Sequence, residues 1–168
     1  AAEFRRRYGP DGDKVFRALV LGSRMPLRLA SLYKATWDFT LYAEGFLAPA
    51  ASGGRFDGSS PFISVDELIG HPALDPDTVS IKDYVAAEAE GRAVPEGKIA
   101  PPALADALEK DAREALQLVE GIAADGKLVA AEVADCRAWA HLSLYFAEKL
   151  RGGVALQRFR ARPDARPA

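Results

Sequence analysis

The sequence predicts an all-α protein, an irregular helical bundle with a long antiparallel helix pair in its C-terminal half and a long loop near residues 45–63. Apolar residues recur at three- and four-residue steps in several segments, and clusters of Pro, Gly and Asp separate those segments. We find no convincing strand pattern. With 168 residues, of which 49% are hydrophobic and 27% charged, the chain has the composition of a folded globular protein. We expect one helical domain over residues 1–160, cut from a larger protein, and a frayed tail over 161–168.

The first part of the chain is predicted to contain helices separated by two breaks. Residues 2–8 already have a helical composition where the chain opens without Met, which indicates a piece of a longer polypeptide. Helix breakers over residues 9–13 precede a new apolar pattern, so a helix is expected to begin near Asp13. Pro26 lies inside that pattern, where proline removes a backbone donor and clashes with the preceding turn. We therefore expect a break over residues 23–26 and a further helix beyond it.

The middle of the chain is predicted to be a long loop followed by two short helices. Between residues 45 and 63 the composition shifts to Gly, Ser, Ala and Pro, and the helical periodicity disappears. Ser64 and Glu67 have the spacing of a capping box, in which the two residues satisfy each other's free backbone amides. This spacing predicts a short helix, and Ser80 opens a second one that is expected to end at Gly91.

The C-terminal half is predicted to contain the antiparallel helix pair. The two prolines at 101–102 are suited to open a helix, because the first turn needs no backbone donors there. Apolar residues then recur along one face until a short break over residues 123–126. A last helix over residues 128–151 is apolar on two sides, which favours a place in the middle of a bundle. The glycine pair at 152–153 is expected to weaken or end this helix.

The charge balance argues against two classes of partner. Lys and Arg number 22 against 24 Asp and Glu, and the formal net charge of -2 gives no general attraction to nucleic acid or to an anionic membrane. No run approaches the roughly 18 consecutive apolar residues of a membrane span. We therefore expect neither nucleic acid nor membrane as a partner. The local basic groups are expected to be solvated termini; they are Arg5, Arg6, Arg7, Arg158, Arg160, Arg162 and Arg166.

Residue types that carry metal or nucleophilic chemistry are scarce. His71, His141 and Cys136 do not have the spacing of a zinc site, and the glycine pairs match neither a phosphate loop nor a dinucleotide-binding motif. No GxSxG elbow holds a serine nucleophile. We assign no catalytic residue, no metal and no cofactor. Cys136 is expected to pack in the core, His141 to lie in the core or at its boundary with a hydrogen-bond partner, and His71 to be a capping or turn residue.

One local cluster combines aromatic rings with carboxylates just before the long loop. Trp37, Asp38, Tyr42 and Glu44 lie within eight residues of one another. Aromatic faces beside carboxylates are the residue types that stack on sugar rings and bind their hydroxyl groups. The same spacing also describes a helix end that packs its aromatic side chains into the core, which is the commoner use of such residues. These four residues are the candidate substrate-binding site, with both interpretations open.

Four segments of the second half resemble the C-terminal helical region of large bacterial glycoside-hydrolase-like proteins. They are SIKDYV at 80–85, GKIAP at 97–101, ALADALE at 103–109 and AWAHLSLYFAEKLR at 138–151. The resemblance implies an accessory helical region, with the catalytic carboxylates on a separate barrel domain. Where those proteins have an aromatic-Pro-Glu segment this chain has GFLAP at 45–49, so no sugar contact is carried over there and no catalytic residue is assigned.

Two functions follow as the leading hypotheses, and a free-standing enzyme is a third, whose sign would be a pocket with convergent polar groups of displaced pKa. The first is a non-catalytic accessory domain of a bacterial carbohydrate-active enzyme, packed on an adjacent catalytic domain and lending residues 37–44 or the following loop to the rim of its cleft. The second is an independent helical module that binds a protein partner or dimerises through an apolar groove. The first predicts an apolar face that an adjacent domain covers, and the second predicts a face that saturates with a discrete partner.

Overall fold

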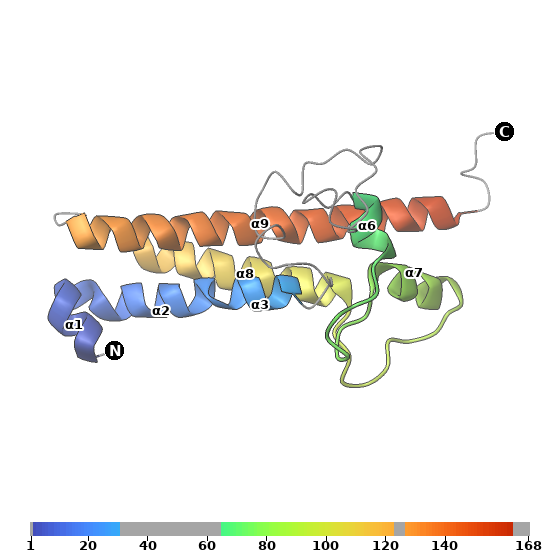
Figure 1. Ribbon diagram of the computed structural model, residues 1–168, viewed down its shortest axis with the longest axis horizontal. Helices are drawn as coiled ribbons and strands as arrows, with labels where there is room; N and C mark the ends of the chain where they lie inside the picture. The colour runs from blue at the N-terminus through green and yellow to red at the C-terminus, as the bar shows by residue number, and fades with distance from the viewer. Residues whose placement is uncertain (1, 31–64, 123–126, 163–168) are drawn as a thin grey trace, which may run out of the picture. The chain divides into compact units, whose positions relative to one another are not determined.

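The computed structural model describes residues 2–30, 65–122 and 127–162, and these residues form helices joined by turns (Figure 1). Within these ranges no strand forms, and the one isolated β-bridge joins Thr78 to Ile99. The predicted all-α class is therefore confirmed. The loop predicted near residues 45–63 lies outside the described residues. In the ranges described, no helix combines the length and apolarity that crossing a membrane requires.

The chain divides into two compact units, each built from an early and a late segment. The first unit comprises Ala1–Met25 and Asp106–Phe146, and the second comprises Pro26–Ala105 and Ala147–Ala168. The prediction of a single domain over residues 1–160 stays a prediction.

The first unit opens with two short helices and a tight connection. Helix α1 (Ala2–Tyr8) is followed by the 3-10 turn η1 (Gly9–Asp11), in which Gly9 has a φ of 65° that favours glycine. Helix α2 (Gly12–Gly22) then begins close to the predicted start at Asp13. A Cβ on Gly12 would collide with the backbone of Phe4, so only glycine allows α1 and α2 to approach this closely.

The break predicted over residues 23–26 is confirmed. Helix α2 ends at Gly22, and α3 (Arg24–Ala30) begins after Ser23, whose amide bonds back to the carbonyl of Leu19 at 2.9 Å. Pro26 therefore falls in the first turn of α3, where its missing donor costs no helical hydrogen bond.

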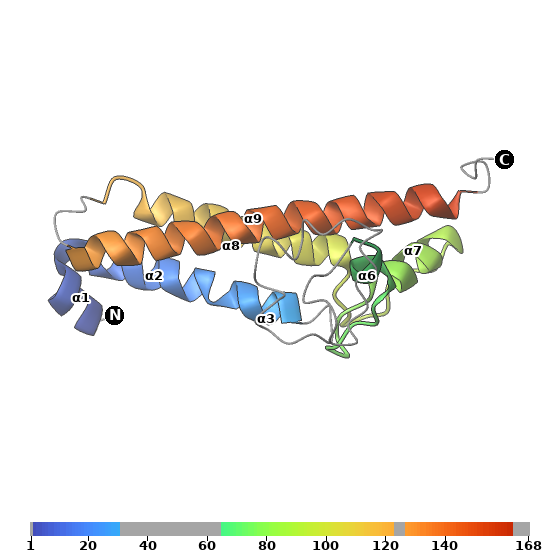
Figure 2. The ribbon, with the colours of Figure 1, turned by 45° about the horizontal axis from the view of Figure 1, so that its top comes forward.

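The core of the first unit lies between α2, α8 (Pro101–Val119) and α9 (Lys127–Ala161). Figures 1 and 2 both show α8 beside α9 here, and the sequence order makes the two helices antiparallel, as predicted. Small side chains dominate the contact, so the helices pack closely. The buried cluster includes Val15, Ala18 and Leu21 from α2, Ala112, Ala115 and Val119 from α8, and Val133, Cys136 and Ala140 from α9.

Helix α8 ends at Val119, a few residues before the predicted break at 123–126. Gly121 follows with a φ of 73°, a conformation that ends helices and that glycine adopts without strain. Ile122 remains buried after this turn. The apolar pattern in the sequence thus extends beyond the end of α8, because Ile122 packs on the core although it lies outside the helix.

The second unit contains α6 (Val65–Gly70) and α7 (Ile81–Ala89), as the capping patterns predict. The Ser80 hydroxyl accepts a hydrogen bond from the Asp83 amide at 3.0 Å, and Gly91 follows α7 with a φ of 68°. These contacts are the N-cap and the glycine stop that define a short helix. Ser64, the predicted cap of α6, lies outside the described residues.

Helix α9 continues to Ala161, so the glycine pair at 152–153 does not end it, and the alternative that the pair weakens the helix stays a prediction. Gly153 is buried against α6 and α7, where a Cβ would lie 3.1 Å from Cδ1 of Ile81 and 3.7 Å from Cγ1 of Ile69. Glycine at 153 therefore marks a close contact between helices. At Gly152 a Cβ would meet no atom within 4 Å.

Substitution of the two glycines by alanine should separate these roles. Gly152→Ala should raise the free energy of unfolding by about 0.5–1 kcal/mol, because alanine favours the helix. Gly153→Ala should lose this gain and fall about 1–2 kcal/mol below Gly152→Ala, since its methyl group presses on the fully buried Ile81. Urea unfolding followed by circular dichroism measures both, and equal stabilisation by the two variants would contradict the contact.

Candidate functional site

The structure bears on only part of the predicted site. The candidate sugar-binding residues Trp37, Asp38, Tyr42 and Glu44 lie outside the described residues, so both interpretations of them stay predictions. His71 directly follows α6 at a bend, as expected of a turn residue. His141 is exposed on α9, so its predicted place in the core or at its boundary is wrong. It lies one position, or about 100° around the helix, from the buried Ala140.

The arginines near the start of the chain are engaged within the first unit. Arg5 pairs with Asp13, and Arg6 pairs with Glu3 on the same helix. The Arg7 guanidinium lies 5.4 Å from the centre of the Tyr8 ring, a cation–π distance. The Arg5–Asp13 pair joins α1 to α2, the other two contacts lie within α1, and together they leave no group of unpaired cations that would favour an anion site here.

The arginines at the end of α9 are likewise engaged in contacts within the second unit. Arg158 donates two hydrogen bonds to Glu88, from Nε and Nη2, each 2.7 Å long. Its guanidinium lies 5.9 Å from the centre of the Tyr84 ring, and Arg160 pairs with Asp66 of α6. These arginines therefore fasten α9 to α6 and α7. Both side chains are 44% exposed, as expected of solvated groups, and they also form ion pairs with residues distant in sequence.

Cys136 is packed among apolar side chains of α2, α8 and α9, as predicted. Burial raises the pKa of its thiol to about 11, and the nearby Glu132 and Asp135 carboxylates add to the effect. A thiol that resists ionisation is a poor nucleophile and a poor metal ligand. Within the described ranges, no three His, Cys, Asp or Glu side chains are grouped so that they could hold a metal ion.

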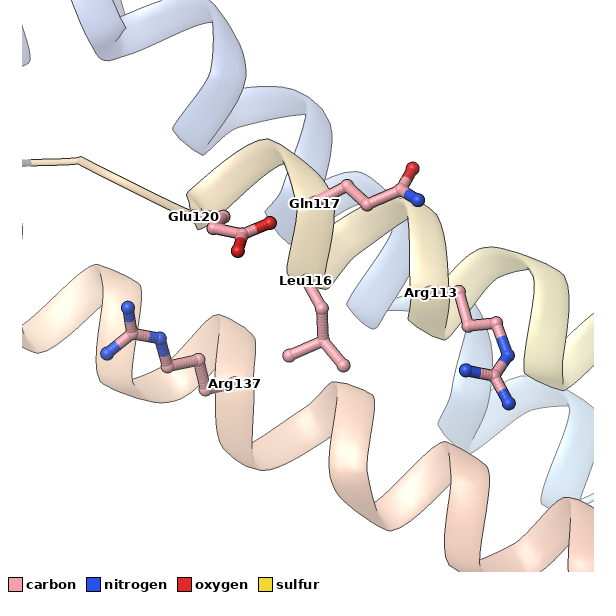
Figure 3. Close-up of a pocket in the computed structure, with 5 residues that line it drawn as sticks. All are labelled: Arg113, Leu116, Gln117, Glu120 and Arg137. Atoms are coloured by element: carbon pink, nitrogen blue, oxygen red, sulfur yellow. The ribbon is translucent and has the colours of Figure 1, made fainter.

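A shallow groove follows the junction of α8 and α9 in the first unit. Figure 3 shows Leu116 pointing from α8 toward α9, with Arg113 on one side and Arg137 on the other. Gln117 and Glu120 complete its lining. Arg113 is already bonded to Glu109 at 2.7 Å. The groove is open to solvent and resembles the ordinary furrow between two packed helices.

A second pocket lies in the second unit, lined by the segment after α6, by α7 and by the segment before α8. It encloses about 390 Å³, within the range of small-molecule sites of roughly 300–1,000 Å³. We call it the loop pocket, and its lining includes Asp75, Pro76, Asp83, Ala87, Arg92 and Lys98.

Backbone and side-chain hydrogen bonds hold the two walls of the loop pocket together. The Val79 amide donates to the Ile99 carbonyl at 2.9 Å, and the Ile99 amide donates to the Asp77 carbonyl at 2.7 Å. Lys98 Nζ donates to the Pro76 carbonyl at 2.7 Å. Figures 1 and 2 show the two segments side by side below α6 and α7. The pocket is thus formed by the fold before any ligand binds.

The loop pocket was not predicted from the sequence. The pairs that hold its walls together are 20 residues or more apart in the chain, for example Thr78 and Ile99 at the bridge. The Pro and Gly content of this stretch indicates irregular backbone but not which side chains meet. The sequence gives no sign of the bridge that joins the two walls, because a single parallel pairing between two loops leaves no periodic pattern.

Comparison with known proteins identifies no relative of this chain: no protein-family description, no curated protein and no solved structure matches it.

Selective labelling should show that Cys136 is shielded by the fold. With a pKa of about 11, only about one thiol in a thousand is ionised at pH 8, and the side chain is buried. We expect a disulfide reagent such as Ellman's to leave the native chain unmodified at pH 8 and to react fully in denaturant. Rapid reaction of the native chain would show that the α2–α8–α9 core opens readily.

The Glu88–Arg158 pair should be visible as a pH effect. The Arg158 guanidinium holds the pKa of the Glu88 carboxyl below its ordinary value of 4.5. The pair therefore stabilises the fold above that value and loses its effect as the pH falls through the lowered pKa. Carboxyl titration by NMR should show Glu88 below 4.5, moving back toward it in Arg158→Gln. A wild-type Glu88 that titrates at 4.5 would mean that the pair does not form in solution.

Proposed function

We propose that this chain is a non-catalytic helical accessory domain of a bacterial carbohydrate-active enzyme, packed on the catalytic domain of that enzyme. Exposed apolar side chains in the second unit carry the proposal. Leu27 is 73% exposed, Leu74 53% and Phe159 55%. Single exposed apolar residues are common, whereas contiguous apolar patches mark interaction sites, and the proposal places these three side chains on the surface that another domain covers.

The first unit differs in this respect. Its one large exposed apolar side chain among the described residues is Phe16, which is 37% exposed and lies against the ring of Phe4, 5.1 Å between centres. The larger number of exposed apolar side chains in the second unit favours that unit as the one on which an adjacent domain packs.

The ionisable groups support a role other than catalysis. A general acid at neutral pH needs a carboxyl group whose pKa is raised by burial or by a like charge. Glu3, Asp13 and Glu88 have the opposite shift, because an arginine bonds to each and lowers its pKa. Asp13 and Glu88 therefore anchor one helix to another, and Glu3 pairs within α1.

The same exposed apolar side chains also favour the alternative, an independent helical module that binds a protein partner or dimerises. The two proposals differ in what covers Phe159 and Leu74. An accessory domain has these residues covered by its own polypeptide, whereas an interaction module has them covered by a separate molecule.

Cysteine labelling should distinguish the two. Phe159→Cys should react fast in the 168-residue chain, where light scattering should report a monomer, and slowly in the full natural polypeptide. Cys136 will not interfere, because it is buried. Lys110→Cys, at an exposed position of the first unit, is the matched control and should react equally in both.

The accessory role fails if Phe159→Cys is equally reactive in both proteins. A natural polypeptide no longer than this chain that forms a discrete dimer, with Phe159→Cys protected in the dimer, would establish the interaction module instead.

A further inference from the structure

We infer that the loop pocket of the second unit binds a neutral ligand rich in hydroxyl groups, such as one ring of a carbohydrate. This inference rests on the proposed function in one respect: it names a ligand class for a carbohydrate-active protein. The pocket itself is defined by its geometry and does not depend on that function.

The first argument is the charge of the lining. Asp75 and Asp83 supply two carboxylates to the lining, whereas its two cations are already paired, Arg92 with Glu90 and Lys98 with Asp77. A site for an anion or a cation gathers the opposite charge around the ligand. With both cations already paired, the lining offers no free positive charge to an anion, and its two carboxylates remain as acceptors for the hydroxyl groups of a neutral ligand.

The second argument is the supply of free donors and acceptors. One oxygen of Asp83 accepts from the Ser80 hydroxyl at 2.6 Å, and one oxygen of Asp75 accepts from the Asp77 amide at 2.9 Å. The second oxygen of each has no partner among the described residues. Arg92 uses Nε on Glu90, and its terminal nitrogens are likewise unengaged. A hydroxyl group both donates and accepts, so it can bond to both kinds of group.

The third argument is that the lining has apolar groups and that its backbone is held in place. Pro72, Pro76, Pro95 and Ala87 present C–H groups, against which the C–H face of a sugar ring can pack. Proline fixes its own φ, and the Thr78–Ile99 bridge fixes the distance between the walls. A preformed pocket loses little entropy on binding, which matters for a ligand that makes few contacts.

NMR titration of the isotopically labelled chain tests the inference. The probes are the methyl glycosides of glucose, galactose, mannose, xylose and N-acetylglucosamine, with glucuronic acid and glucosamine as charged comparators. We expect at least one neutral glycoside to give saturable amide shifts confined to residues 72–98, with the charged comparators binding no more tightly.

Two alanines on α7 supply a matched pair of variants. Ala87 lines the pocket, whereas its exposed neighbour Ala86 does not. Ala87→Phe should fill the pocket and weaken binding by about tenfold or more, and Ala86→Phe should leave it unchanged. Circular dichroism checks that both variants remain folded.

The inference is overturned if no neutral glycoside shifts residues 72–98, if a charged comparator binds more tightly, or if the two phenylalanine variants behave alike. Binding that is lost in Trp37→Ala but kept in Ala87→Phe also overturns it, and would place the sugar site at residues 37–44. None of these results bears on the labelling of Phe159→Cys. The pocket and the accessory role can therefore fail separately.

Discussion

Close contact at the small residues of α9 is the constraint on which both compact units depend. In the first unit, Cys136 and Ala140 allow α9 to approach α2 and α8, and Gly22 of α2 lies where a Cβ would be 3.3 Å from Cβ of Trp139. In the second unit, Gly153 does the same for α6 and α7. Apolar burial supplies the stability, but the residues with the smallest side chains decide where the helices can touch. A larger side chain at such a site costs free energy even when it is apolar.

Ion pairs between charged side chains add further contacts between the helices. Arg17 bonds to Glu114 at 3.1 Å and Arg24 to Asp111 at 3.3 Å, so two ion pairs join α2 and the start of α3 to α8. The arginines of α9 fasten the other unit. Exposed pairs of this kind contribute little stability each, and their main effect is to select one arrangement of the helices among several apolar packings.

Local features explain how much of the fold could be predicted. The prolines at 101–102, the cap at Ser80 and the break before Pro26 act within one helical turn, and each appears where the sequence places it. The extent of α9 could not be predicted, since a glycine pair reads as a helix stop unless the side chains of Ile81 and Ile69 are known to lie against it. The Arg158–Glu88 pair and the loop pocket depend on residues that are distant in the chain. The aromatic cluster at residues 37–44 lies outside the described residues, so the sequence remains its only support.

The division of each unit between an early and a late segment has a consequence for synthesis on the ribosome. Helices α6 and α7 are translated before residues 147–161, whose Gly153 lies against their apolar side chains. Until the end of α9 emerges, Leu68, Ile69 and Ile81 have no α9 surface on which to pack. Contacts between distant segments form late and slowly, and exposed apolar surface on a nascent chain favours aggregation. We therefore expect the second unit to fold only after α9 has been synthesised. Chaperones that bind nascent apolar segments should bind this chain until then.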